Sequence, residues 1–118
     1  MIIGTGVDIT EVRRIRQAVE KWGDEFLNRV FTKTEIKNAR TRISFYQHLA
    51  GRFAAKEAIF KAVGDNLLFW QDIQVHNDQQ GKPICQFLNG KCRDINVYIS
   101  ISHVKTYAVA SAVIVKKS

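Results

Sequence analysis

Apolar residues recur at helical spacing through the first half of the chain and alternate with polar residues in the second half. Residues 1–7 form a short apolar run broken by glycines, which predicts a first strand. Glycines inside a strand mark a bulge or a close approach of two backbones. Apolar stripes with a period of about 3.6 residues then predict helices. These helices span residues 12–22, 24–30, 32–42 and 43–63, and Thr32 and Glu35 have the spacing of a capping box at the start of the third.

Alternating residues in the second half predict strands over 69–75, 83–88, 95–101 and 107–115. A strand, a group of helices and then several antiparallel strands indicate an α+β fold with one long central helix. The sequence contains no repeat and no linker. We therefore expect residues 1–118 to form one domain, which is long enough for one core.

The most informative stretch is residues 52–64, the end of the long helix, which closes on Gly64 as a C-terminal cap. Glu57 and Lys61 fall on one face, one turn apart, while the rest is apolar nearly all round, as in a buried helix. Charges in such a helix need partners. Either Glu57 and Lys61 form a structural ion pair, or Glu57 faces a cation and Lys61 an anion, as in a metal–phosphate site.

Asp8 follows the first strand and also has two interpretations. It can cap the next helix, with Glu11 reaching back as in a capping box. Thr10 could cap that helix equally well, which would leave Asp8 free at the end of the strand. Two carboxylates on different elements can bind one Mg²⁺. Asp8 and Glu57 are therefore candidate metal ligands.

Basic groups complete this set of candidates, because a lysine, an arginine and a histidine can hold phosphates. Lys61, Arg52 and His103 are the residues considered. The net charge of +7 favours an acidic partner, which could be nucleic acid, a phosphorylated ligand or an acidic protein. The first long helix carries an arginine cluster around Arg14 that would suit docking to an acidic helix.

No apolar run approaches the ~18 residues of a membrane span, and no secretory signal is evident, so we expect no membrane association. The two cysteines are expected to be reduced thiols in a cytoplasmic protein. A non-enzymatic basic module that binds nucleic acid or a carrier protein would also explain the charge. It would not explain Glu57 beside Lys61, and the chain lacks the interleaved aromatic residues of single-strand binders.

Two segments carry a resemblance to a known family. Residues 4–12 (GTGVDITEV) resemble the opening motif of the holo-acyl-carrier-protein synthases, and residues 51–64 (GRFAAKEAIFKAVG) resemble their second signature. Residues 70–75, 81–83, 100–103 and 107–110 are similar to the remaining motifs, in the same order. The resemblance covers essentially the whole chain.

This resemblance implies the 4′-phosphopantetheinyl transferase fold and a Mg²⁺-dependent transfer of 4′-phosphopantetheine from coenzyme A to a serine of apo acyl carrier protein, in support of fatty acid biosynthesis. By the family pattern, Asp8 and Glu57 ligate Mg²⁺, and Lys61 contacts the phosphates of coenzyme A. The pattern also implies a homotrimer that does not bind nucleic acid. Further residues assigned by it are Arg52, Gly64 and His103 for coenzyme A and Arg14 for the carrier protein.

The chain departs from the family in the loop after Gly64. That loop is usually longer and contains further glycines, whereas here it is short and Asp65 adds a negative charge. The departure bears on the backbone contacts expected for the phosphates and the pantetheine arm.

Overall fold

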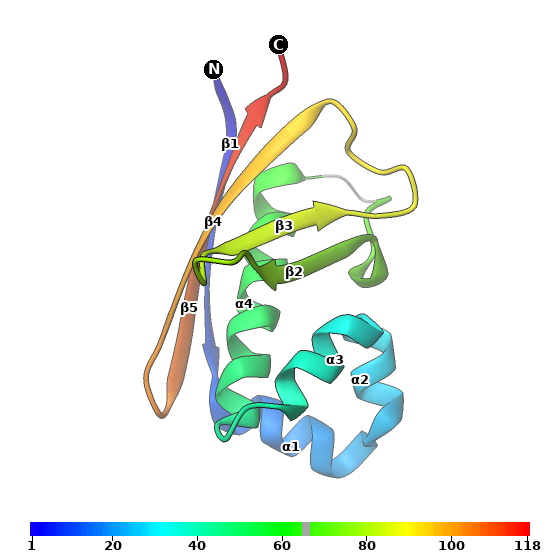
Figure 1. Ribbon diagram of the computed structural model, residues 1–118, viewed down its shortest axis with the longest axis vertical. Helices are drawn as coiled ribbons and strands as arrows, with labels where there is room; N and C mark the ends of the chain where they lie inside the picture. The colour runs from blue at the N-terminus through cyan, green and yellow to red at the C-terminus, as the bar shows by residue number, and fades with distance from the viewer. Residues whose placement is uncertain (65–66) are drawn as a thin grey trace.

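A long central helix, α4 (Phe45–Val63), lies against an antiparallel sheet (Figure 1). The computed structural model describes residues 1–64 and 67–118. The other helices are α1 (Val12–Trp22), α2 (Asp24–Val30), α3 (Lys33–Arg40) and the 3₁₀ helix η1 (Trp70–Asp72). The strands are β1 (Ile2–Glu11), β2 (Ile73–Asn77), β3 (Pro83–Phe87), β4 (Ile95–His103) and β5 (Tyr107–Lys116). The predicted α+β class and the long central helix are confirmed.

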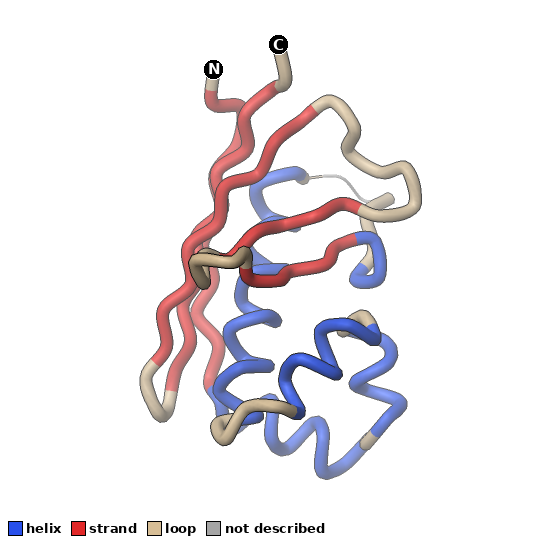
Figure 2. Tube along the Cα trace, in the orientation of Figure 1, coloured by secondary structure: helices blue, strands red, loops and turns tan. Residues whose placement is uncertain are grey.

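The strands form two antiparallel sheets, a larger one in the order β1-β5-β4 and a hairpin of β2 and β3. Figure 2 shows the helices gathered on one side of the larger sheet. The inner face packs on α4, through small side chains of β5 that are fully buried: Ala108, Ala110 and Ala112. Within the described residues, no helix is long and apolar enough to cross a membrane.

Glycines in β1 determine how closely α4 approaches the sheet. A Cβ atom on Gly4 would collide with the carbonyl oxygen of Ala62, and one on Gly6 with that of Ala58. The register of β1 against β5 also shifts between Ile2 and Gly4, so the predicted bulge and close approach are both present. Since side chains alternate along a strand, Asp8 points to the same face as the glycines, toward α4. The glycines thus bring Asp8 beside the helix.

The capping interpretation of Asp8 is wrong. β1 continues to Glu11, well beyond the predicted end, because its pairing with β5 persists as far as Glu11 and Tyr107. Helix α1 begins directly after Glu11 and has no side-chain cap. Neither Asp8 nor Thr10 therefore caps it. The capping box predicted for α3 is present, since Thr32 and Glu35 exchange both hydrogen bonds.

Other boundaries also differ from the sequence prediction. The strand predicted from residue 69 begins at Ile73, because the carboxylate of Asp72 accepts a hydrogen bond from the backbone N–H of Phe69 and stabilises η1. The long helix begins at Phe45 instead of Ile43, which is fully exposed in the preceding turn. These two differences move no candidate site residue, but the strand predicted to end at residue 101 runs on to His103, because its pairing with β5 continues to Ala108.

Candidate active site

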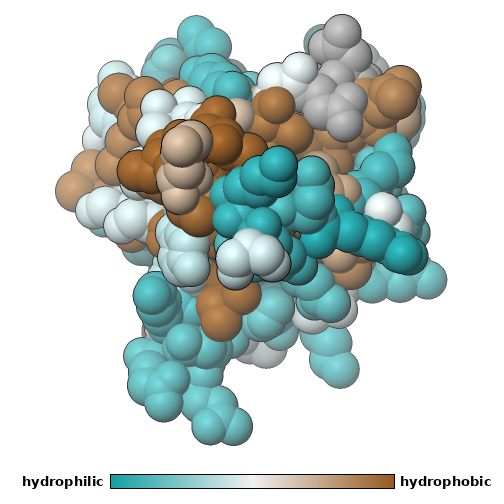
Figure 3. All heavy atoms as spheres, turned by 90° about the horizontal axis from the view of Figure 1, so that it is seen from above, coloured by the Kyte–Doolittle hydropathy of each residue, from teal (hydrophilic) through white to brown (hydrophobic). Residues whose placement is uncertain are grey.

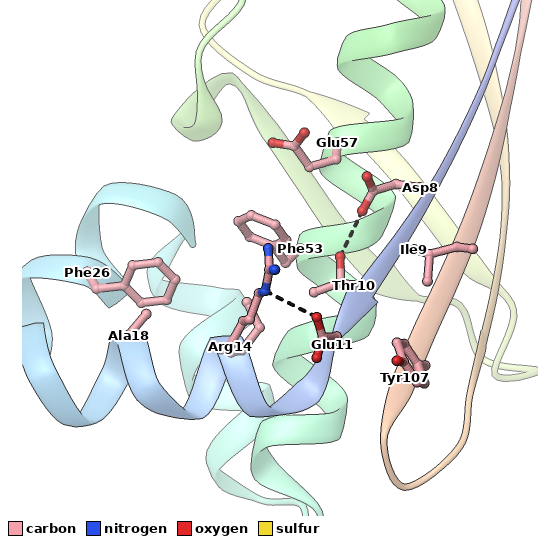
Figure 4. A pocket seen from close by; sticks show the side chains of 11 residues that line it. Asp8, Ile9, Thr10, Glu11, Arg14, Ala18, Phe26, Phe53, Glu57 and Tyr107 are labelled. Carbon is pink, nitrogen blue, oxygen red and sulfur yellow. Dashed lines mark hydrogen bonds and ion pairs between the residues drawn. The ribbon is translucent and has the colours of Figure 1, made fainter.

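A cleft of about 560 Å³ opens between α1, β1 and α4. Figure 4 shows Asp8 and Glu57 side by side at one end of this cleft, with Phe26 and Ala18 at the other and Arg14 reaching between them. Phe53 forms part of its wall. One end of the cleft is therefore acidic and the other is apolar.

Both oxygens of the Asp8 carboxylate have partners. Oδ1 accepts a hydrogen bond from Nζ of Lys61 at 3.2 Å, and Oδ2 accepts one from the hydroxyl of Thr10 at 2.7 Å. Nζ of Lys61 also donates to the carbonyl oxygen of Val7 at 3.0 Å. These contacts join β1 to the last turns of α4 beside the cleft, although Lys61 itself is not among the described residues that line it.

Glu57 is half-buried one turn before Lys61. The structural ion pair between Glu57 and Lys61, one of the two alternatives, is not formed in the described part of the chain, since Lys61 pairs with Asp8. Burial raises the pKa of Glu57 above its ordinary value, and the negative charge of Asp8 raises it further, while Lys61 partly offsets both. Two carboxylates thus face one another, and a bound cation would relieve their repulsion.

The donor set suits magnesium. Mg²⁺ usually takes one or two protein carboxylates and fills its remaining positions with water and substrate phosphate oxygens. Asp8 and Glu57 supply two carboxylates at an open cleft. Among the described residues, no cluster of three or more histidine, cysteine, aspartate or glutamate side chains is placed to hold a metal ion. The site therefore fits a metal that a phosphorylated substrate helps to bind.

Arg14 lies on the same cleft, from the first turn of α1. Its side chain is 76% exposed, and its Nε lies 3.2 Å from a carboxylate oxygen of Glu11. Exposed ion pairs of this kind contribute little to stability. Arg14 is therefore free to exchange Glu11 for a carboxylate on another molecule.

Arg52 and His103 lie in a second cluster, and neither is among the described residues that line the cleft. Arg52 is almost fully buried, and its Nη2 donates to Oδ1 of Asn77 at 2.9 Å. Burial lowers the pKa of the neighbouring His48 to about 4, and nearby basic side chains lower it as well. Those groups are Arg52, Arg42 and His103. Their electrostatic coupling places Arg52 and His103 in one basic region that suits an anion.

Gly64 ends α4 in the left-handed conformation, with φ of 68°, as a C-terminal cap requires. The structure places it beyond Lys61 and outside the described lining of the cleft. In the shortened loop that follows, residues 65–66, with the negative charge expected from Asp65, lie outside the described part of the chain.

The sequence analysis did not predict a second lysine–carboxylate pair, which is formed by Lys56 and Glu35. Nζ of Lys56 lies 2.7 Å from Oε1 of Glu35, and both side chains are fully buried. Lys56 also donates to the carbonyl oxygens of Val30 and Trp70, and Oε2 of Glu35 accepts from the backbone N–H of Val75. The capping box pointed to Glu35, but no local pattern indicates that the same carboxylate reaches α4.

The chain is similar to known proteins over nearly its whole length. The 4′-phosphopantetheinyl transferase superfamily matches residues 4–112. The chain is 44% identical to a holo-[acyl-carrier-protein] synthase of Protochlamydia amoebophila, covering 96% of this chain and 98% of the relative. It is 38% identical to the same enzyme of Koribacter versatilis, covering 97% of this chain and 98% of the relative.

The chain is also similar to solved structures of holo-acyl-carrier-protein synthases. A crystal structure of a holo-(acyl-carrier-protein) synthase from Bacillus anthracis, in complex with CoA (3′,5′-ADP), matches with a TM-score of 0.86 and 39% identity. The match covers 100% of this chain and 99% of that one. The holo-[acyl-carrier-protein] synthase of Helicobacter pylori in complex with coenzyme A matches with a TM-score of 0.85 and 28% identity, over 94% of this chain and 99% of that one.

Proposed function

The chain belongs to the 4′-phosphopantetheinyl transferase superfamily, and from this we propose that it transfers 4′-phosphopantetheine from coenzyme A to a serine of an apo acyl carrier protein. The other product is adenosine 3′,5′-bisphosphate. The observation that carries the proposal is that Asp8 and Glu57 line one cleft, with Lys61 paired to Asp8 beside it. We place the reaction in the cytoplasm, in support of fatty acid biosynthesis, where Cys85 and Cys92 remain reduced.

In this reaction the serine oxygen forms a bond to a phosphorus of the coenzyme A pyrophosphate as the bond to the bisphosphate breaks. A general base accepts the serine proton. Asp8 and Glu57 would hold Mg²⁺, which neutralises pyrophosphate oxygens as charge develops on them. The Lys61 side chain is 55% exposed, so Nζ can turn from Asp8 toward a phosphate. Its positive charge would then bind and orient the pyrophosphate.

The activity is tested by incubating the protein with coenzyme A, Mg²⁺ and an apo carrier protein and weighing the carrier by mass spectrometry. We expect a mass gain equal to one phosphopantetheine group, which requires both coenzyme A and the metal. Chelation of the metal should abolish the gain. The proposed activity would be contradicted if several different carrier proteins, each folded and in the apo form, all failed to gain mass.

We propose that the basic face of α1, centred on Arg14, docks the acidic carrier protein. Its exposure and its weak pairing with Glu11 support this role, because charges at an interface rim mainly raise the association rate. Arg14→Glu should therefore raise the KM for the carrier and leave that for coenzyme A nearly unchanged. Arg93→Glu makes the same charge change on an exposed loop far along the chain and serves as the control. Equal effects of the two variants would exclude a specific docking role.

We assign the nucleotide end of coenzyme A to the region of Arg52 and His103, with Gly64 near the pyrophosphate. This assignment is supported by the positive groups gathered around His48. Because Arg52 is buried and fixed by Asn77, its guanidinium is preorganised for an anion and does not need to be ordered on binding. His103→Ala should raise the KM for coenzyme A more than the KM for the carrier.

We also propose a homotrimer with each site at a boundary between subunits. The outer face of the larger sheet supports it, since apolar side chains there are exposed, among them Ile9 at 67%. The others are Val7, Tyr98 and Tyr107. Viewed from above, apolar atoms gather on the side where the sheet lies (Figure 3). An exposed apolar patch of this kind is typical of a protein interface.

The shared site predicts complementation between two inactive variants. In this arrangement Asp8, Glu57 and Lys61 belong to one subunit, and Arg52 and His103 to its neighbour. Glu57→Ala and His103→Ala would each be nearly inactive alone, but co-refolding would create some boundaries with both residues intact. Activity should partly return. A mixture that stays inactive, although native mass measurement shows mixed trimers, would rule out the shared site.

A further inference from the structure

Thr10 sits beside Asp8 on the inner face of β1. Because side chains alternate along a strand, residues two apart share a face. The Thr10 hydroxyl donates to Oδ2 of Asp8 at 2.7 Å, and Thr10 itself is only 7% exposed (Figure 4). It also lines the cleft. The hydroxyl is therefore a fixed donor that water cannot easily replace.

The two partners of the Asp8 carboxylate differ in mobility. Lys61, on Oδ1, is a long side chain that is 55% exposed and can leave. Thr10, on Oδ2, is β-branched and stiff about its first side-chain bond. If Lys61 moves to a phosphate, the Thr10 hydrogen bond still restricts rotation of the carboxylate. Oδ1 is then the oxygen left facing the cleft.

We propose that Thr10 is a positioning residue whose hydroxyl holds the Asp8 carboxylate so that Oδ1 is presented to the metal. The inference rests on the proposed function, since it assumes that Asp8 and Glu57 bind a divalent cation. Partners that orient a metal ligand commonly matter for affinity almost as much as the ligands themselves. A hydrogen bond that served only the strand would affect stability and leave metal binding unchanged.

Direct binding of Mn²⁺ separates these roles, because Mn²⁺ takes the same oxygen ligands as Mg²⁺. Free Mn²⁺ is followed by electron paramagnetic resonance in the presence of coenzyme A and without carrier protein, so that no transfer occurs. We expect Thr10→Val to weaken Mn²⁺ binding by about tenfold, while Thr10→Ser, which keeps the hydroxyl, binds as the wild type does. Thr41→Val is the control, since it removes an exposed hydroxyl bond of the same 2.7 Å length at the end of α3.

Steady-state kinetics supply a second readout. Thr10→Val should raise the Mg²⁺ concentration needed for half-maximal activity and leave kcat at saturating Mg²⁺ close to that of the wild type. If the valine variant does not fold, Thr10→Ala compared with Thr10→Ser replaces it in both measurements.

Two outcomes would overturn the proposal, and they are distinguishable. If Thr10→Val binds Mn²⁺ as tightly as the wild type while Asp8→Asn does not, the metal site stands and Thr10 has no positioning role. If the wild type and Asp8→Asn bind Mn²⁺ equally, Asp8 is not a ligand, and the metal site falls together with the role of Thr10.

Discussion

Helix α4 carries two lysines that each pair with a carboxylate from another element. Lys56 and Glu35 are both fully buried, whereas the Lys61 side chain is 55% exposed beside Asp8. Lys56 donates to three acceptors, which satisfies all the donors of an ammonium group. Lys61 donates to two, the carbonyl oxygen of Val7 and the carboxylate of Asp8. The same chemical pair is closed in one place and open in the other.

The difference follows from what surrounds each pair. The Lys56–Glu35 pair joins α4 to the backbone of α2, η1 and β2, and no ligand can reach it. Around the Asp8–Lys61 pair, Glu57 adds a further carboxylate whose raised pKa reflects burial and the charge of Asp8. A satisfied buried pair specifies the fold, while an open pair with surplus negative charge is able to bind something else. On a single helix, burial therefore distinguishes a structural ion pair from one that is available to bind a ligand.

The largest expected effect is on the buried pair. Lys56→Met leaves the Glu35 carboxylate buried without its partner, and breaking a buried pair in this way costs about 3–5 kcal/mol of unfolding free energy. The measurement is a urea or guanidinium titration followed by circular dichroism. Lys61→Met is the matched control, with the same substitution on the same helix. A Lys56→Met protein as stable as the control would show that the two pairs do not differ in the way proposed.

The next effect concerns activity. Asp8→Asn and Glu57→Gln, which hardly change volume, should each reduce transfer by more than ~100-fold, because loss of a ligand should exceed the 10–100-fold that loss of an outer partner costs. Mass spectrometry of the carrier protein gives the rate, and circular dichroism should show an intact fold. Full metal-dependent transfer by Asp8→Asn would return that residue to a purely structural pairing with Lys61.

A smaller effect is expected on stability at the open pair. Lys61→Met should change the free energy of unfolding by less than ~1 kcal/mol, as for other exposed ion pairs, while transfer falls sharply. Denaturant titration and the transfer assay are run on the same preparation. If stability and activity fell together, Lys61 would belong with Lys56 as a structural residue.

The smallest effect is on titration of Glu57, whose pKa is raised by burial and Asp8 and lowered by Lys61. Carbon-13 NMR of the Glu57 carboxyl, without metal, should show its pKa falling in Asp8→Asn and rising further in Lys61→Met. Since only the ionised carboxylate binds a cation, Mn²⁺ affinity of the wild type should weaken as the pH falls through the raised pKa. An unchanged Glu57 pKa in both variants would mean that the three groups are not electrostatically coupled.

Much of the fold could be read from local patterns. The helical stripes, the alternating strands, the capping box at Thr32 and the glycine cap at Gly64 depend on residues close in sequence, and all are confirmed. The end of the first strand, which was predicted too early, depends on a distant partner. β1 runs to Glu11 because β5, almost a hundred positions away, continues to pair with it.

The candidate site divides in the same way. The sequence by itself determined which groups are available, since the acidic and basic residues at Asp8, Glu57 and Lys61 are visible in it, and family motifs single them out. Only the tertiary structure decided their partners. Gly4 and Gly6 let α4 approach β1, so Lys61 meets Asp8 instead of Glu57, and Thr10 bonds to a carboxylate instead of capping a helix. Hydrogen bonds and charge pairs depend on distance in space, which sequence spacing specifies only within one element.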